Sequence, residues 1–358
     1  MPSLAIVNAS DRSDGITQDI KPYFERLSRS GYSVKWYQCV DYHGVPYVPE
    51  GGITVHGLGF PSRLLDMGIN RLWVFPHRLH QLSEETVLLA DPTLARIAPS
   101  TDRLIAKVHD VRPLTRYSDH FSTRLMFRNV LPRLKRLPRV IVPSTFVQQE
   151  LVGLSFDPSI IRVVPETHQL GYHPEHVERL LDRVRNRKET RVLYVGADRP
   201  YKNIELVLEV ARQMERRDGH QYTFTFVSRF REQTRQRCAD LGLKNVRVLS
   251  DVESMSSIYE ESDLLVFPSL YEGFGRPLIE AMAYGLPIVA NRIEPVVEVV
   301  GDGGILLDAP DADVWAEALS SLEDLEMLEF FARKSLDRSK AFTPERFEEA
   351  LFKALRSM

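Results

Sequence analysis

The sequence lacks the features that mark several classes of protein. Its two cysteines, Cys39 and Cys238, lie far apart in 358 residues, which argues against a disulfide framework and fits a reducing compartment. No apolar run approaches the roughly 18 residues that suggest a membrane span. The apolar run from Leu4 to Val7 has neither a basic head nor a cleavage site, so it does not resemble a secretion signal. These absences predict a cytoplasmic protein.

Signals for nucleic acids, dinucleotides and metals are weak as well. A formal net charge of −3 gives no bulk attraction to nucleic acid. There is no Gly-X-Gly-X-X-Gly after the first apolar run and no lysine-centred P-loop, which argues against a nicotinamide dehydrogenase. His77 and His80 have no third ligand, so a zinc site is not expected. Asp311-Ala-Asp313 is similar to a metal-binding Asp-X-Asp, but it is explained more simply as the N-cap of a helix that begins near Val314.

Apolar runs alternate with helical patterns along the whole chain. Strands are expected at residues 4–7, 33–37, 53–56, 104–108, 140–142, 163–165, 191–195, 224–227, 246–249, 264–267 and 288–290, and helices at 17–30 and from Asn203. Such alternation indicates parallel sheets covered by helices, and 358 residues usually divide into two domains. The predicted fold class is therefore α/β, with two doubly wound domains. The charged segment 178–190 is expected to be helical or a linker.

The segment from Pro268 to Pro287 is the most informative part of the chain. The apolar run 264–267 before it predicts a buried strand, and Pro277 predicts the first residue of a helix. With that start, the cap would be Arg276 and the capping-box position Ile279, so no capping box forms. The expected unit is a strand, a glycine turn, a helix and a second strand.

This unit can hold a sugar that is attached to a nucleoside diphosphate. A helix N-terminus presents unpaired N–H groups and a positive dipole end, which suit a diphosphate without a metal, and Gly273 and Gly275 let the backbone come close. Glu272 precedes the helix, where its natural partner is a sugar hydroxyl. Glu280, expected in the first helical turn, can accept from the two hydroxyls of a ribose. Compensation of the helix dipole is the other interpretation of Glu280.

The segment resembles the signature of retaining glycosyltransferase family 4, a Glu, Gly-Phe-Gly, Pro, Glu pattern within the GT-B fold, and the resemblance extends over residues 4–347. It implies two Rossmann-like domains that face each other across a cleft. Residues 1–165 would bind the acceptor, with the C-terminal helix 345–358 packed back on them, and residues 166–344 would bind the donor. Phe274 is then expected among the donor-binding residues, together with the glycines beside it.

Two residues of the first half match positions of this family. His109 ends a strand in Val108-His109-Asp110, a context similar to the family's catalytic histidine. The resemblance implies that His109 contacts the donor sugar while its backbone carbonyl faces the developing oxocarbenium ion. Gly15 stands between the first strand and a helix, like the family's glycine loop near the donor phosphates. A structural histidine and an ordinary turn glycine are the alternatives.

The loop Gly196-Ala-Asp-Arg-Pro-Tyr-Lys-Asn203 supplies cations. Lys202 and Asn203 match the family's lysine and the following asparagine or glycine, whereas Ala197 stands where an arginine is common. Arg199 is the nearby substitute. Arginine and lysine are the expected partners of a leaving diphosphate, although both side chains could also be solvated surface charges.

Two departures from the family pattern bear on the donor site. Glu166-Thr-His-Gln169 replaces a common Asn-Gly-Val-Asp, so contacts near the hinge are expected to differ. Arg276 replaces an apolar residue after Gly-Phe-Gly, and it could face phosphate or solvent.

The stretch 124–139 mixes cations with apolar residues and has no acidic residue. Such stretches can lie on anionic membrane surfaces. The same apolar positions could instead pack the helix on its own sheet and leave a solvated basic face. Peripheral contact with the inner face of the cell membrane is therefore one of two expectations.

Together these features predict a metal-independent, retaining hexosyltransferase without a cofactor. The donor would be a GDP- or UDP-linked hexose, with mannose and glucose as the candidates, and the acceptor a glycan, a lipid-linked sugar or a small molecule. The alternative is a catalytically silent homologue that binds nucleotide-sugar as a partner subunit, which the retention of His109, Lys202, Glu272 and Glu280 argues against. Another GT-B reaction, hydrolysis or phosphorolysis of a nucleotide-sugar, is a third possibility.

Overall fold

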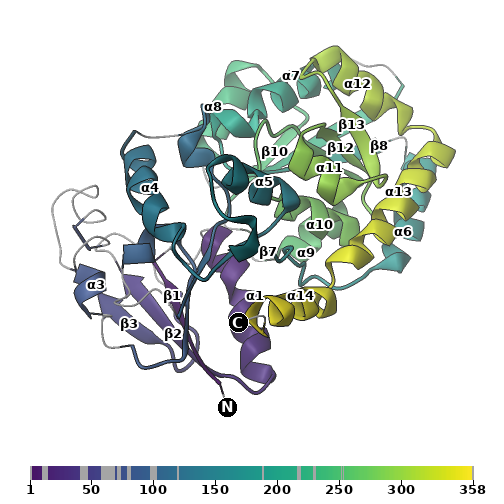
Figure 1. Ribbon diagram of the computed structural model, residues 1–358. Helices are drawn as coiled ribbons and strands as arrows, with labels where there is room; N and C mark the ends of the chain where they lie inside the picture. Colours follow the sequence, from purple (N-terminus) through teal and green to yellow (C-terminus); the bar gives the residue numbers. More distant parts are fainter. Residues whose placement is uncertain are drawn as a thin grey trace. The chain divides into compact units, whose positions relative to one another are not determined.

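The computed structural model describes residues 2–9, 15–40, 47–57, 69–70, 74–78, 82–96, 103–118, 121–187, 189–215, 219–228, 231–250, 252 and 254–356. The chain divides into two compact units, Met1–Glu166 with Glu348–Met358, and Thr167–Phe347. Each unit is a parallel sheet with helices on its faces (Figure 1).

The described part of the first unit contains a seven-stranded parallel sheet in the order β3-β2-β1-β4-β5-β6-β7. Its strands are β1 (Ser3–Asn8), β2 (Ser33–Val40), β3 (Ile53–His56), β4 (Thr86–Leu89), β5 (Leu104–Lys107), β6 (Arg139–Val142) and β7 (Ile161–Val163). Its helices are α1 (Gly15–Arg29), α3 (Phe75–Arg78), α4 (Phe121–Leu134) and α5 (Thr145–Gly153). The strand order reverses between β1 and β4, and ligands bind beyond the carboxyl ends of strands at such a point.

The second unit repeats this plan with six parallel strands in the order β10-β9-β8-β11-β12-β13 among its described residues. Its strands are β8 (Glu189–Val195), β9 (Gln221–Val227), β10 (Val246–Leu249), β11 (Leu264–Phe267), β12 (Ile288–Asn291) and β13 (Gly304–Leu307). Its helices are α6 (Pro174–Arg187), α7 (Ile204–Glu215), α8 (Arg231–Asp240), α9 (Met255–Glu261), α10 (Arg276–Ala283), α11 (Glu294–Val300), α12 (Ala312–Ser321) and α13 (Leu325–Ser339). Here the order reverses between β8 and β11.

The structure corrects several predicted boundaries. Helix α10 begins at Arg276 with Gly275 as its N-cap, so Pro277 is the second helical residue and not the first. The segment 178–190 is largely helical, because most of it belongs to α6. The sequence prediction missed β4 and β13. Asp311 does cap α12, since its carboxylate accepts from the backbone N–H groups of residues 313 and 314, but this helix begins two residues earlier than expected.

The last helix, α14 (Pro344–Arg356), contacts the first unit through its C-terminal part (Figure 1). The carboxylate of Glu348 accepts from the Ser30 hydroxyl at 3.0 Å, and the ring of Phe352 stacks on Tyr32 with centroids 6.0 Å apart. The buried guanidinium of Arg139, on β6, donates to the carbonyl of Leu355 at 3.2 Å. Residues 348–356 therefore pack against α1 and β6.

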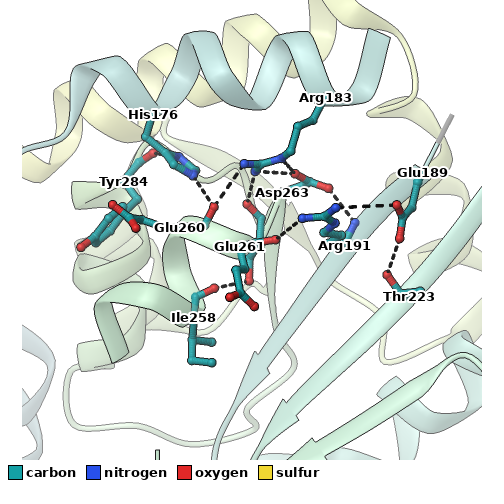
Figure 2. Close-up of polar contacts among 11 residues, drawn as sticks. His176, Arg183, Glu189, Arg191, Thr223, Ile258, Glu260, Glu261, Asp263 and Tyr284 are labelled. Atoms are coloured by element: carbon teal, nitrogen blue, oxygen red, sulfur yellow. Dashed lines mark hydrogen bonds and ion pairs between the residues drawn. The ribbon is translucent and has the colours of Figure 1, made fainter. Parts of the chain in front are cut away.

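Cations surround the C-terminal end of α9 and hold the strand that follows it (Figure 2). Arg183 on α6 donates twice to one Asp263 oxygen, at 2.8 and 3.1 Å, while Arg191 on β8 donates from Nη1 to the Glu261 carbonyl at 3.3 Å. The two ring nitrogens of His176 face the carbonyl oxygens of residues 260 and 284, at 2.9 and 2.8 Å. Burial raises the pKa of Asp263, and Arg183 opposes the shift. These contacts fix α6, α9 and the start of β11 to one another.

The end of α10 provides a test of packing in the second unit. Gly285 has φ +66°, and a Cβ there would lie 2.6 Å from Val177 Cγ2, whereas Gly242 has φ +67° with nothing within 4 Å. Both Gly→Ala changes should cost about 1–2 kcal/mol for the left-handed backbone, and Gly285→Ala should cost about 1–3 kcal/mol more for the clash. Denaturant unfolding of the two variants measures the difference. Equal losses of stability would show that the predicted clash at Gly285 relaxes without cost.

Candidate functional site

Two loops meet beyond the carboxyl ends of β8 and β11, the strands on either side of the reversal. The backbone N–H of Leu270 donates to the Tyr201 carbonyl at 2.7 Å, and Lys202 Nζ lies 2.5 Å from Glu272 Oε1. The side chains of Lys202 and Glu272 are 16% and 11% exposed. Two residues that the sequence placed in the donor site are thus brought together as a largely desolvated ion pair.

The local backbone explains how Lys202 is presented. Residues Pro200–Lys202 form a single 3-10 turn, which Asn203 ends with φ 52° and ψ 46°. Among residues other than glycine, asparagine is one of the few that adopt this left-handed conformation readily. Arg199 directly precedes the turn and is half-buried. Its expected contact with a diphosphate stays a prediction.

Glu280 is held by two donors on the inner side of α10. Its Oε2 accepts from the Tyr259 hydroxyl at 2.8 Å, and its Oε1 accepts from Arg276 Nη2 at 3.1 Å. The Arg276 side chain therefore pairs with Glu280, four residues along the same helix. Because the helix starts at Arg276, Glu280 lies in its second turn and not in its first. Burial, followed by the charge of Glu280, raises the pKa of Tyr259.

The glycines and the phenylalanine of the turn have different surroundings. Gly275 has φ 104°, and a Cβ there would lie 2.8 Å from Leu278 Cδ1, so this N-cap requires glycine. The Phe274 ring is buried and packs edge-on against Phe342, with centroids 5.6 Å apart. Phe274 therefore anchors the turn to the core of the second unit. The predicted approach of a ligand to Gly273 and Gly275 is not tested by these contacts.

His109 follows β5 in the first unit, and both of its ring nitrogens lie beside polar groups. Nε2 is 3.0 Å from the Ala90 carbonyl oxygen, and Nδ1 is 3.1 Å from Asp19 Oδ2. Since a carbonyl oxygen only accepts, Nε2 carries the proton of that hydrogen bond. The predicted contact with a donor sugar stays a prediction. Gly15 is the first residue of α1, and the residues 10–14 before it lie outside the described part.

Three polar residues beside His109 were missed as site residues by the sequence prediction. Lys107 is fully buried, and its Nζ lies 2.7 Å from Glu166 Oε1 and 4.7 Å from the centre of the Tyr23 ring. Asp19, His109 and Glu166 offer ligand atoms within 4.8 Å of one another, and the ammonium of Lys107 already pairs with one of these carboxylates. Burial, then the charge of Asp19, raises the pKa of Glu166, and Lys107 opposes the shift. In the sequence, only the presence of Lys107 inside an apolar strand indicated that these polar residues come together around His109.

The residues after Glu166 lead into the second unit. The Thr167 hydroxyl donates to the Phe342 carbonyl at 2.9 Å, and the His168 side chain is buried. Burial lowers the pKa of His168, while the backbone of Ser339 opposes the shift. Residues 166–168 differ from the family pattern. As a result, the buried carboxyl group of Glu166 ends the first unit, and the buried imidazole of His168 lies near the start of the second.

Known proteins share both the sequence pattern and the fold. A family model described as glycosyl transferases group 1 matches residues 181–338. The chain is 27% identical over 260 residues to O-antigen chain mannosyltransferase B of Escherichia coli, with 68% of each protein covered. It is 31% identical over 253 residues to an MMP alpha-(1->4)-mannosyltransferase of Mycolicibacterium hassiacum, with 64% of this chain and 59% of that protein covered. The crystal structure of Anabaena HepE in complex with UDP and glucose matches with a TM-score of 0.76 over 100% of both chains, at 17% identity.

The fold and these matches define the class of protein: it is a glycosyltransferase with the GT-B fold. Within this class, residues 181–338 match the group 1 glycosyl transferases, and the Glu272–Glu280 motif in this range resembles the signature of family 4. The predicted fold class is confirmed, and the matches support the predicted family.

The buried Lys107–Glu166 pair gives a prediction for stability. Lys107→Met leaves the Glu166 carboxylate without its buried partner and should lower the free energy of unfolding by about 3–5 kcal/mol, whereas the double change Lys107→Met/Glu166→Leu should recover most of that loss. Since protonation removes the uncompensated charge, the loss in Lys107→Met should shrink as the pH falls. Denaturant unfolding at several pH values measures both effects. A double variant as unstable as Lys107→Met would contradict the pairing.

Proposed function

We propose that the protein is a retaining transferase that moves a hexose, mannose or glucose, from a nucleoside diphosphate to an acceptor held mainly by the first unit. The observation that carries the proposal is the contact of Lys202 with Glu272 beside the N-terminus of α10. It joins the two loops at the strand-order reversal, where ligands bind in such sheets. The names of the two mannosyltransferase relatives support a hexose, and HepE, solved with UDP and glucose, supports a uridine diphosphate donor.

In this proposal each group acts on a different part of the donor. The N-terminus of α10 and the Lys202 ammonium, with Arg199, bind the diphosphate, and Glu280 accepts from the ribose hydroxyls. Lys202 then exchanges its contact with Glu272 for phosphate, which frees the Glu272 carboxylate to accept from a sugar hydroxyl. The backbone carbonyl of His109 faces the positive charge that develops at the anomeric carbon.

The transfer step follows from this arrangement. The bond between the anomeric carbon and the diphosphate oxygen breaks, the acceptor oxygen bonds to the same face of that carbon, and the departing phosphate takes the acceptor proton. Lys202 and the helix N-terminus carry the charge that grows on the phosphate, so their effect is larger in the transition state than in the bound donor. No divalent ion and no cofactor take part in this proposal. The acceptor is a glycan, a lipid-linked sugar or a small molecule.

We also propose that α4 docks on an anionic membrane surface. Phe121 and Leu125 are 78% and 50% exposed, and the exposed cations Arg128 and Arg136 follow them along the helix and its C-terminal turn. Arg124 instead turns inward and donates to the Thr115 carbonyl at 2.6 Å. Among the described helices, none is both long and apolar enough to cross a bilayer. Apolar side chains followed by cations suit the interface of an anionic membrane.

Vesicle binding tests this docking face. The protein should sediment with vesicles that contain phosphatidylglycerol and not with pure phosphatidylcholine, and Arg128→Gln/Arg136→Gln should weaken binding by about 1 kcal/mol for each cation removed. Arg333→Gln/Lys334→Gln, which removes two exposed cations from α13, is the control and should bind as the unchanged protein does. Equal binding by both double variants would exclude α4 as the docking face.

Nucleotide binding tests the division of roles between the two glutamates. Glu280→Ala should weaken binding of the bare nucleoside diphosphate by about 1.5–3 kcal/mol, the range for a charged hydrogen bond. Glu272→Ala should spare or tighten it, because Lys202 then loses its competing partner. Calorimetric titration measures both, with the exposed Glu317→Ala on α12 as control. Equal weakening by Glu280→Ala and Glu272→Ala would refute this division.

Metal independence has a direct test. The helix N-terminus and Lys202 supply the positive charge that the diphosphate needs. Transfer should therefore continue at an unchanged rate in the presence of a chelator such as EDTA. Loss of transfer with EDTA and its recovery with added manganese would contradict the proposal.

A further inference from the structure

One face of the sheet in the second unit is polar across three neighbouring strands, β8, β9 and β10. Parallel strands that are covered by helices on both faces usually read as continuous apolar runs. Strand β9 alternates instead, with buried aromatic rings at residues 222, 224 and 226 and half-buried threonines, Thr223 and Thr225, between them. One face of β9 therefore belongs to the core, and the other face is only partly covered.

Two arginines share the partly covered face with these threonines. Thr223 is paired with Arg191 of β8, and Thr225 is paired with Arg247 of β10. Side chains of residues paired across neighbouring strands point to the same face of a sheet, and the strands lie about 4.8 Å apart. Two guanidinium groups therefore flank two hydroxyl groups on this face.

A cavity of about 320 Å³ is lined by these side chains. The polar residues of its lining include Arg191, Thr223, Thr225, Lys244, Arg247 and Glu261. Val246 and Ile258 add apolar surface, and Ile258 and Glu261 come from the short helix α9 (Figure 2). A cavity of this size suits a small molecule.

The cavity lies away from the contact of Lys202 with Glu272. That contact forms beyond the carboxyl ends of β8 and β11, whereas Lys244 precedes β10 and Ser262 precedes β11. The end of β8 is four residues beyond Arg191, a distance of roughly 13 Å along the strand. The lining of the cavity therefore differs from the residues proposed to bind the donor.

The charge of the lining favours an anion. Arg191, Lys244 and Arg247 are cations, and Glu261 is the one acidic residue in the described lining. A second carboxylate, that of Glu189, lies outside the lining, with its Oε2 3.8 Å from Arg191 Nη2. Positive charge remains in excess when both carboxylates are counted.

The contacts that these cations already make are long. Arg191 Nη1 lies 3.3 Å from the Glu261 carbonyl oxygen, and Arg247 Nη1 lies 3.5 Å from Glu261 Oε2, whereas hydrogen bonds between ions are typically about 2.7–2.9 Å. Within the part of the chain that the structure describes, no group forms a hydrogen bond or ion pair with the Lys244 ammonium or the Thr225 hydroxyl. These donors can therefore turn to a ligand without the loss of a short contact.

We propose that this cavity binds a small phosphate ester that carries hydroxyl groups. A phosphate ester has a charge of about −1.5 to −2 at pH 7 and three acceptor oxygens, and guanidinium groups bind such oxygens in pairs. Arg191 and Arg247 bind the phosphate, and Thr225 donates to it. The carbon part lies against Val246 and Ile258, where Glu261 accepts from a hydroxyl group of the ester. This ligand is separate from the donor, so the proposal does not depend on the transfer reaction.

Three variants separate this cavity from the donor site. Lys244→Gln/Arg247→Gln removes two exposed cations of the lining. Arg333→Gln/Lys334→Gln removes two exposed cations from α13 and is the control of equal net charge. Lys202→Gln removes the cation of the donor site, and its amide can still donate to Glu272. Circular dichroism and thermal unfolding establish that each variant folds.

The first readout is a titration of the full chain with glycerol 3-phosphate, followed by the ³¹P resonance of the ester. We expect binding within about twofold of the unchanged protein in Lys202→Gln and in the α13 control. Lys244→Gln/Arg247→Gln should weaken binding about tenfold or more, the scale of one charged hydrogen bond. Thr225→Val, which keeps the shape of the side chain and removes its hydroxyl, should weaken binding about two- to tenfold.

Three results of this titration would overturn the proposal. The first is equal binding by Lys244→Gln/Arg247→Gln and the unchanged protein. The second is loss of binding in Lys202→Gln alone, which would assign the ester to the donor site. The third is binding of inorganic phosphate as tight as that of glycerol 3-phosphate, which would leave an ion site and no site for an ester.

The second readout locates the ligand. In the full chain labelled with ¹³C-methyl threonine, the methyl signals of Thr223 and Thr225 are assigned from the spectra of Thr223→Val and Thr225→Val. Both signals should shift with glycerol 3-phosphate and stay in place with glycerol. Unmoved signals at saturating ester would contradict the assigned cavity. Neither readout needs enzymatic activity, so absence of transfer would count against the proposed function and leave these results standing.

Discussion

The reversal of strand order beside the first strand of each sheet is the constraint on which the site depends. In the first unit it lies between β1 and β4, and in the second between β8 and β11. In open parallel sheets, ligands bind beyond the carboxyl ends of the strands at such a reversal. The loops that carry Lys202 and Glu272 meet at this place in the second unit.

In both units, charged side chains near the candidate site residues form ion pairs. Lys202 with Glu272, Arg276 with Glu280, and Lys107 with Glu166 are each close contacts between largely buried groups. A buried charge without a partner would cost several kcal/mol, which explains why each cation has an acid beside it. The pairs in the second unit involve the residues proposed to bind the donor.

Local sequence was sufficient to predict the strand, turn and helix of the segment 264–287 and insufficient for the residues around His109. The turn before α10 combines a strand, glycines and a proline within some twenty residues, and each of these has a strong local preference. Lys107 and Glu166 are 59 residues apart, and only the strand order brings them together. The cap at Gly275 was missed because proline is tolerated in the first turn of a helix as well as preferred at its first residue, so its position alone does not fix the start. The strand β4 is only four residues long and lies between polar segments, which leaves little periodicity to detect.

The stereochemistry of the product is the most direct test of the proposed transfer. The site as proposed offers Glu272 for hydroxyl contacts and a phosphate that takes the acceptor proton, and Nε2 of His109 already donates to the Ala90 carbonyl. In the proposed reaction none of these groups activates an acceptor on the face opposite the leaving group. Proton resonance spectra of fresh product from an α-linked nucleotide-sugar report the anomeric configuration. Retaining transfer gives an α-glycoside, and a β-glycoside would contradict the proposed mechanism.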